Sequence, residues 1–193
     1  MTTVTGNGLT LHFRDEEPTR RCGACQLCCK LVPVKNLDKD AGQRCRYQRV
    51  GKGCTVHAVL EAVSPSCRHW SCRWLMGDDT ADLSRPDRSH YVIDLMPDFI
   101  TIRNEETGAV DHVEAIQIWV DPGYPDAHED PALRAYLERR GVENKVALLR
   151  WSNTKGAVIF PPALSSNREW NVVLSGLNAA EHTIDEVVKA LSG

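Results

Sequence analysis

The feature that most constrains this chain is a stretch of eight residues, Cys22–Cys29, with the sequence C-G-A-C-Q-L-C-C. Its four thiols are too many for so short a segment to bury as ordinary core residues. Four more cysteines follow, and none lies after Cys72. A thiolate is a soft, charged ligand that is costly to bury unless it is neutralised, so the pattern predicts a metal or cluster site. The candidate ligands are Cys22, Cys25, Cys28, Cys29, Cys45, Cys54, Cys67 and Cys72.

The redox state of these thiols depends on the compartment. Residues 1–21 contain no apolar run of the kind found in secretory signal peptides, and no apolar run approaches the roughly 20 residues of a membrane span. We therefore expect a cytoplasmic protein with no membrane segment, in which cysteines act as ligands. Structural disulfides would need an exported protein, and buried inert thiols would explain only one or two positions.

The spacing of the cysteines restricts how they can share a metal. The thiols of C-x2-C-x2-C (Cys22, Cys25, Cys28) can curl round one ion or cluster, a spacing found in iron–sulfur proteins. A zinc ribbon would repeat C-x2-C downstream, whereas this chain continues with C-x8-C and C-x4-C. The adjacent side chains of Cys28 and Cys29 are expected to diverge, so either they serve two neighbouring sites or one is spare. Eight thiols divide naturally into two sets of four, but the pairing stays open, as does the choice between zinc and an iron–sulfur cluster.

The order of the cysteines also resembles a known family. After C-x2-C-x2-C-C the chain continues to Gly53-Cys54-Thr55-Val56 and ends with P-S-C-R-H-W-S-C-R-W-L over residues 65–75. In motif, order and ending, residues 22–75 resemble the YkgJ-type cysteine-cluster family, the CxxCxxCC domain described as zinc- or iron-chelating. The resemblance implies that all eight cysteines chelate metal. His57 stands where that family usually has an aromatic residue, and Ser64 where it has arginine; neither departure removes a thiol.

The rest of the pattern predicts an α+β protein. A small cysteine-rich metal-binding module (residues 21–77) is expected to pack on a mainly antiparallel β domain (residues 86–193) with two or three helices. Residues 1–20 read as an N-terminal arm, and the Asp-rich segment 78–88 as the boundary. Alternating or continuous apolar residues predict strands at 9–13, 91–95, 99–102, 113–120, 145–151, 157–160 and 170–174, with a turn at 96–98.

Capping residues predict the helices. Asp130 as cap, Pro131 at the first helical position and Gly141 past the end frame one helix, with Leu133 and Leu137 facing inward. A capping box formed by Thr183 and Glu186 predicts a second helix, which would bury Val187, Val188 and Leu191.

A third, short helix is expected inside the cysteine-rich module. Thr55 can cap it and Pro65 ends it, with Val56, Val59, Leu60 and Val63 at helical spacing. Its length would hold Cys54 and Cys67 about 13 Å apart. These two thiols can therefore share a metal only if residues 64–66 fold back along the helix.

Charge is distributed unevenly along the chain. Residues 20–73 carry eleven Lys or Arg against three acidic residues, although the whole chain has a net charge of −3. A basic segment suggests nucleic acid, but eight thiolates with two divalent ions would leave about four negative charges to offset. We therefore expect the cations to face buried negative sites, and Tyr47, Trp70 and Trp74 to belong to the core rather than to stack on bases. The cations considered are Arg21, Lys30, Arg44, Arg46, Arg68 and Arg73.

Other residues bear on the site only weakly. His57 and His69 lie within the module and are permissible ligands, while the acidic stretch 121–130 reads as a solvated loop. We expect a metal-binding protein whose partners are metal ions, with a protein partner left open and neither nucleic acid nor a membrane expected. Two alternatives remain: an iron–sulfur-dependent redox or protein-modifying enzyme, and a nucleic-acid-binding adaptor. The sequence assigns no reaction and no role to residues 86–193.

Overall fold

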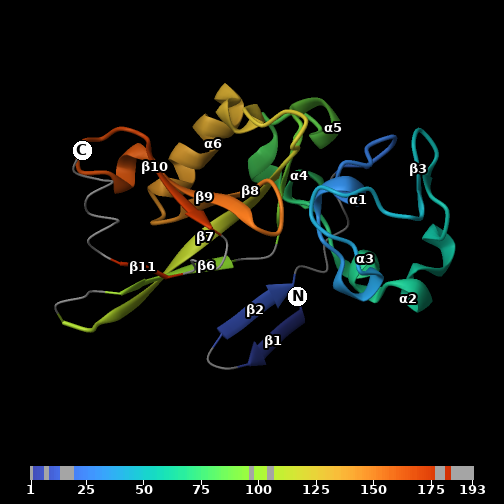
Figure 1. Ribbon diagram of the computed structural model, residues 1–193, viewed down its shortest axis with the longest axis horizontal. Helices are drawn as coiled ribbons and strands as arrows, with labels where there is room; N and C mark the ends of the chain where they lie inside the picture. Colours follow the sequence, from blue (N-terminus) through green and yellow to red (C-terminus); the bar gives the residue numbers. More distant parts are fainter. Residues whose placement is uncertain are drawn as a thin grey trace.

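The structure is a computed structural model, and it describes residues 2–6, 9–13, 20–95, 98–103, 107–176 and 181–183. Its class is α+β with mainly antiparallel strands, which confirms the prediction from the sequence. Figure 1 shows the sheet with a long helix, α6, packed on it, and the segment that contains all the cysteines beside it.

The helices and strands have the following bounds. The strands are β1 (Thr2–Gly6), β2 (Leu9–Phe13), β3 (Gln48–Arg49), β4 (Gly53–Cys54), β5 (Tyr91–Ile93), β6 (Asp98–Arg103), β7 (Val110–Val120), β8 (Val146–Arg150), β9 (Lys155–Phe160), β10 (Asn171–Gly176) and β11 (Glu181–Thr183). The α-helices are α1 (Cys28–Leu31), α2 (Leu60–Val63), α3 (Pro65–His69), α4 (Arg73–Met76), α5 (Pro86–Ser89) and α6 (Pro131–Gly141). The 3-10 helices are η1 (Lys35–Leu37), η2 (His57–Val59), η3 (Asp78–Thr80), η4 (Ala127–Glu129) and η5 (Pro162–Leu164).

The main sheet has the strand order β10-β9-β8-β7-β6-β11. The strand β5 pairs antiparallel with one end of β7 and β6 with the other, so both lie along the same edge of this long strand. The strands β7 and β8 are parallel because α6 crosses between them, and β11 is parallel to β6. The hairpins β1–β2 and β3–β4 are separate two-stranded sheets.

The helix α6 forms where its capping residues predict it. The Asp130 side chain accepts a hydrogen bond of 3.0 Å from the Ala132 backbone N–H, and Pro131 is the first helical residue. Gly141 is the last residue of the helix rather than the one after it. The face that packs against β5, β7 and β8 is fully buried and consists of Leu133, Tyr136 and Leu137.

The strand β5 is buried on both faces, which alternation of apolar residues did not predict. Tyr91 and Ile93 belong to the core beneath α6. The Val92 side chain points to the opposite face of the strand. It packs with Leu27, the residue before α1, and with Leu31, the last residue of α1. The cysteine-rich segment therefore covers the second face of this strand.

Most of the other strands predicted from the sequence are present in the structure. The strands expected at 9–13 and from 99 to 174 are present as β2 and β6–β10. The described part of residues 86–193 contains two α-helices, α5 and α6, in agreement with the two or three expected there. The cysteine-rich segment has four α-helices where one was expected, because each is a single turn of four or five residues without a helical apolar pattern. The turn at 96–97 and the helix after Thr183 lie outside the described residues, and Thr183 itself ends β11. None of the helices described is long and apolar enough to span a membrane.

Candidate metal centre

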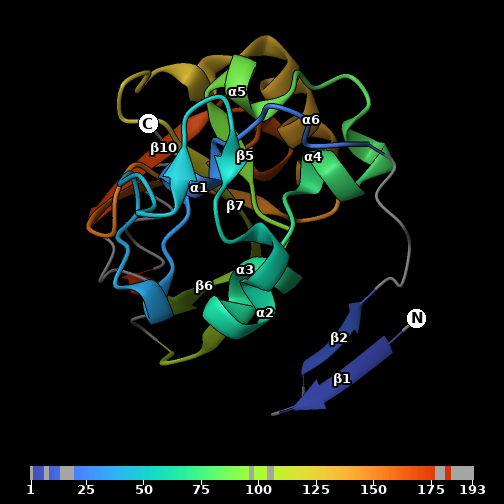
Figure 2. The same cartoon turned by 90° about the vertical axis from the view of Figure 1, so that its right-hand side faces the viewer.

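All eight cysteines line one cavity of about 600 Å³. Figure 2 views this part of the molecule face on, with α1, α2 and α3 in front of the sheet. The thiols come from five parts of the chain: α1 with the turn that leads into it, the loop before β3, β4, α3, and the residue that precedes α4. The apolar part of the wall includes Val32, Leu37, Val56, Leu60, Val63 and Leu75.

The first four cysteines are positioned by a turn and by the anchoring of α1. The Cys25 N–H donates to the Cys22 carbonyl at 3.0 Å. The intervening Gly23 has φ +56°, a left-handed conformation that favours glycine. Leu27 and Leu31 are almost fully buried against the sheet, which directs Cys25 and Cys28 toward the buried Cys72.

Cys72 joins the cavity to the sheet. Its backbone forms an isolated antiparallel bridge with Asp94, just past β5, and α4 begins at the next residue. Its side chain is 8% exposed and packs in the same cluster as Cys25 and Cys28.

The β3–β4 hairpin brings Cys45 and Cys54 together. The Gln48 N–H donates to the Cys45 carbonyl at 3.0 Å, and Gln48 is paired with Cys54 across the hairpin. Gly51 in the turn has φ +74°. The Cys45 N–H also donates to the Cys29 carbonyl at 2.9 Å, so this hairpin is tied to the first turn of α1.

The prediction of a single helix between Cys54 and Cys67 is wrong. Thr55 does not cap it, because both its N–H and its hydroxyl donate to the Tyr47 carbonyl. The apolar residues form η2 and α2, and the chain turns back at Ser64, whose φ and ψ are −157° and 86°. The following helix α3 packs against α2. The fold-back that a shared site for Cys54 and Cys67 requires is therefore present.

Ser64 holds this reversal from inside the fold. It is completely buried, and its hydroxyl lies 3.2 Å from the Cys67 sulfur as a donor. The same hydroxyl donates to the Asn36 side-chain oxygen at 3.1 Å, so η1 is linked to the start of α3.

Lys39 is the one buried cation in the wall of the cavity, among the residues whose burial is described. Its ammonium donates to the carbonyls of Lys30, Val32 and Asp40. Burial lowers the pKa of Lys39, and nearby thiolates oppose this shift. These neighbouring thiols are Cys45, Cys29, Cys28 and Cys67. The sequence did not single out Lys39, since nothing in its spacing distinguishes it from the other ten basic residues of the segment.

The thiols differ in acidity because their surroundings differ. The Cys28 thiol donates a hydrogen bond to the Cys29 sulfur, which lowers the pKa of Cys29 to about 7 and raises that of Cys28. Burial raises the pKa of Cys72 to about 11. Both side chains line the same cavity, with their sulfurs in contact.

The cavity is wider than a formed metal site. All eight cysteines are free thiols rather than disulfides. Within the part of the chain that the structure describes, no three His, Cys, Asp or Glu side chains are gathered closely enough to hold a metal ion. The donor set fits zinc or an iron–sulfur cluster in chemistry and number, because both take four thiolates. Binding would require the thiols to move inward from the wall.

A buried carboxylate connects this region to the sheet. Asp94, 7% exposed, accepts hydrogen bonds from the indole of Trp70 at 2.9 Å, from Trp119 at 3.2 Å and from the Gln117 amide at 3.1 Å. Trp70 lies between Cys67 and Cys72 in the chain, whereas the other two donors belong to β7. The tryptophan is therefore part of the core, as expected, and its N–H is not available to a nucleic acid.

Two of the basic residues named from the sequence, Lys30 and Arg73, pair with carboxylates rather than with the thiols. The Lys30 ammonium forms an ion pair with Asp121, in which Nζ lies 2.7 Å from Oδ2. The Arg73 guanidinium forms an ion pair with Asp79 at 3.0 Å. Asp121 is 3% exposed, so the expectation that the acidic stretch is a solvated loop is wrong at this position. Of the six cations named from the sequence, Arg68 alone is among the residues that line the cavity.

The two histidines are placed differently. His57 lines the cavity, although it is exposed. His69 is outside the lining and lies 3.3 Å from Glu61 on the surface, with both side chains about two-thirds exposed or more.

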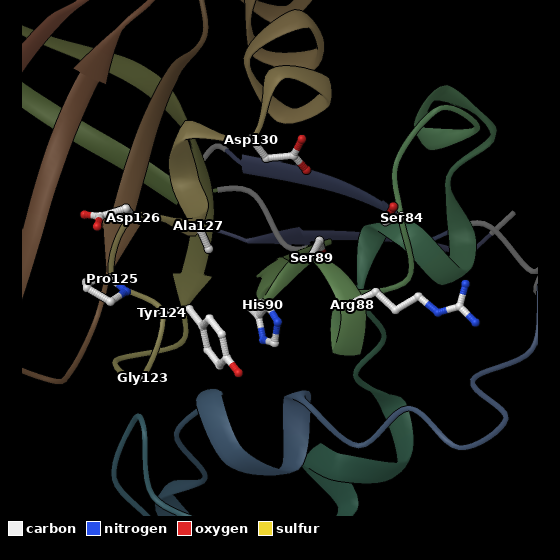
Figure 3. A pocket seen from close by; sticks show the side chains of 10 residues that line it. All are labelled: Ser84, Arg88, Ser89, His90, Gly123, Tyr124, Pro125, Asp126, Ala127 and Asp130. Carbon is white, nitrogen blue, oxygen red and sulfur yellow. The ribbon is translucent and has the colours of Figure 1, made fainter.

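A second hollow, of about 640 Å³, is lined by α5, the loop after β7 and η4, and no cysteine is among its lining residues. Figure 3 shows the rings of His90 and Tyr124 face to face at its edge; their centroids are 3.5 Å apart and the planes are inclined by 12°. His90 has φ +63°, a left-handed conformation found at the ends of helices. The hollow is wide open, and its charged side chains are of both signs, so it does not select a ligand class.

Comparison of the chain with protein-family models, with curated proteins and with solved structures gave no match.

Proposed function

We propose that this chain is a metal-binding protein that holds zinc or an iron–sulfur cluster with its eight cysteines. The observation that carries the proposal is that eight thiols, separated by up to fifty residues in sequence, line a single cavity. Core packing alone gives no reason to gather every cysteine of a chain at one place. A shared soft cation gives such a reason.

Electrostatics supports the same conclusion. Several thiols raise the pKa of their neighbours by repulsion, and one buried ammonium, that of Lys39, faces the cluster. A bound cation would allow the thiolate forms to coexist and would draw them inward. The cysteines supply the ligands, and no reaction is proposed for the centre.

The metal would also stabilise the fold locally. Residues 20–77 contain only single-turn helices, 3-10 turns and a hairpin of two-residue strands. Their buried apolar side chains are few, namely Leu27, Leu31, Leu37 and Ala41 besides Cys72. In small modules of this kind metal binding contributes directly to folding.

We propose that the protein works in the cytoplasm or another reducing compartment. Free thiols persist there, and the eight cysteines are free. The resemblance of residues 22–75 to the YkgJ-type cysteine-cluster family supports the same chelating role.

Elemental analysis of protein purified without air tests the proposal. A brown sample that contains iron and sulfide would identify an iron–sulfur cluster, and a colourless sample that releases zinc on thiol modification would identify zinc. Cys25→Ala should lower the metal content, whereas Ser71→Ala, a control in the same wall, should leave it unchanged. Native protein without zinc or iron, or a Cys25→Ala variant with full metal content, would contradict the proposal.

A further inference from the structure

The cysteines fall into two groups according to their neighbours. In the first group, Cys25 and Cys28 pack against Cys72 in the apolar cluster that joins α1 to the sheet. The turn before α1 brings Cys22 to the same side through the bond from the Cys25 N–H.

The second group surrounds the hairpin. Its backbone is tied to Cys29 through the Cys45 N–H, and strand pairing brings in Cys54. The fold-back at Ser64 adds Cys67.

The groups meet at Cys28 and Cys29. Successive residues of a helix point about 100° apart, so α1 can present one thiol toward the sheet and the next toward the hairpin. The Cys28 and Cys29 thiols are in hydrogen-bond contact. Lys39 faces Cys28 together with three members of the second group, and therefore lies near this junction.

We infer that, if the proposed function is correct, the chain holds two adjacent metal centres with separate ligand sets. The first centre is ligated by Cys22, Cys25, Cys28 and Cys72. The second centre is ligated by Cys29, Cys45, Cys54 and Cys67. Each set has four thiolates, which closes a tetrahedral zinc site or satisfies one cluster.

Paired substitutions test the division by metal content. Cys25→Ser and Cys54→Ser should each remove half of the metal of the native protein. Cys25→Ser with Cys72→Ser affects a single centre and should also leave half, whereas Cys25→Ser with Cys54→Ser affects both and should leave none. Loss of all metal in any single variant would overturn the division and favour one shared cluster. Half retention in the cross-group double variant would overturn the assignment of ligands.

A second measurement uses the native protein, so that it does not depend on the folding of variants. A limited amount of chelator removes part of the metal, iodoacetamide alkylates the thiols released, and mass spectrometry locates the labels in each molecule. Molecules that have lost half of their metal should carry labels on all four cysteines of one group. Labels scattered over both groups would overturn the division. Native protein without metal would instead contradict the proposed function itself.

Discussion

Replacing Trp70 with phenylalanine should loosen the attachment of the cysteine-rich segment to the sheet. The substitution removes the indole N–H that donates to the buried carboxylate of Asp94 at 2.9 Å, but keeps an aromatic ring. A hydrogen bond to a charged group contributes about 1.5–3 kcal/mol, and the smaller ring loses some apolar contact as well. We expect the free energy of unfolding to fall by about 2–3 kcal/mol, or Tm by roughly 4–12 °C.

The assay is urea unfolding of metal-loaded protein, with Trp74→Phe as the matched control. The Trp74 indole donates to a neutral acceptor, the Leu83 carbonyl at 3.1 Å, for which about 0.5–1.5 kcal/mol is expected. A double-mutant cycle with Asp94→Asn should give a coupling energy of about 1 kcal/mol or more between Trp70 and Asp94. The reasoning is refuted if Trp70→Phe costs no more than the control, or if the cycle shows no coupling.

Three further changes have defined outcomes. Lys39→Met removes the buried charge that faces the thiols, and chelator competition should show metal affinity about 10-fold weaker or more; unchanged affinity would contradict its role. Asp130→Ala removes the cap of α6 and should cost about 1–2 kcal/mol in urea unfolding, an effect absent if the cap is dispensable. Lys30→Met leaves the buried Asp121 carboxylate without its ammonium partner and should cost about 1–3 kcal/mol in the same assay; a neutral effect would show that water solvates this carboxylate.

Local signals in the sequence predicted the parts of the fold that local interactions determine. The helix α6 could be predicted because Asp130 and Pro131 are capping residues next to an apolar face. The β8–β9 hairpin could be predicted because two apolar runs flank a polar turn. These elements depend on residues close together in the chain.

The parts that could not be predicted depend on contacts between distant residues. The reversal at Ser64 needs Asn36, and the burial of Val92 on the second face of β5 needs Leu31 of α1. Lys39 could not be distinguished as the cation of the cavity, because its position is set by three carbonyl acceptors rather than by a motif.

The same distinction applies to the candidate site. The eight cysteines could be named from their spacing, but a division into ligand sets could not. The division depends on the helical turn of α1 between Cys28 and Cys29, and on the β3–β4 hairpin, which places Cys54 close to Cys45.

X-ray absorption at the metal edge of protein purified without air tests the central claim most directly, because it identifies both the metal and its ligand atoms. We predict a zinc or iron edge whose first shell consists of sulfur at about 2.3 Å, with four sulfur neighbours for each zinc ion. A first shell of oxygen or nitrogen at about 2.0–2.1 Å, or protein with neither edge, would contradict the account.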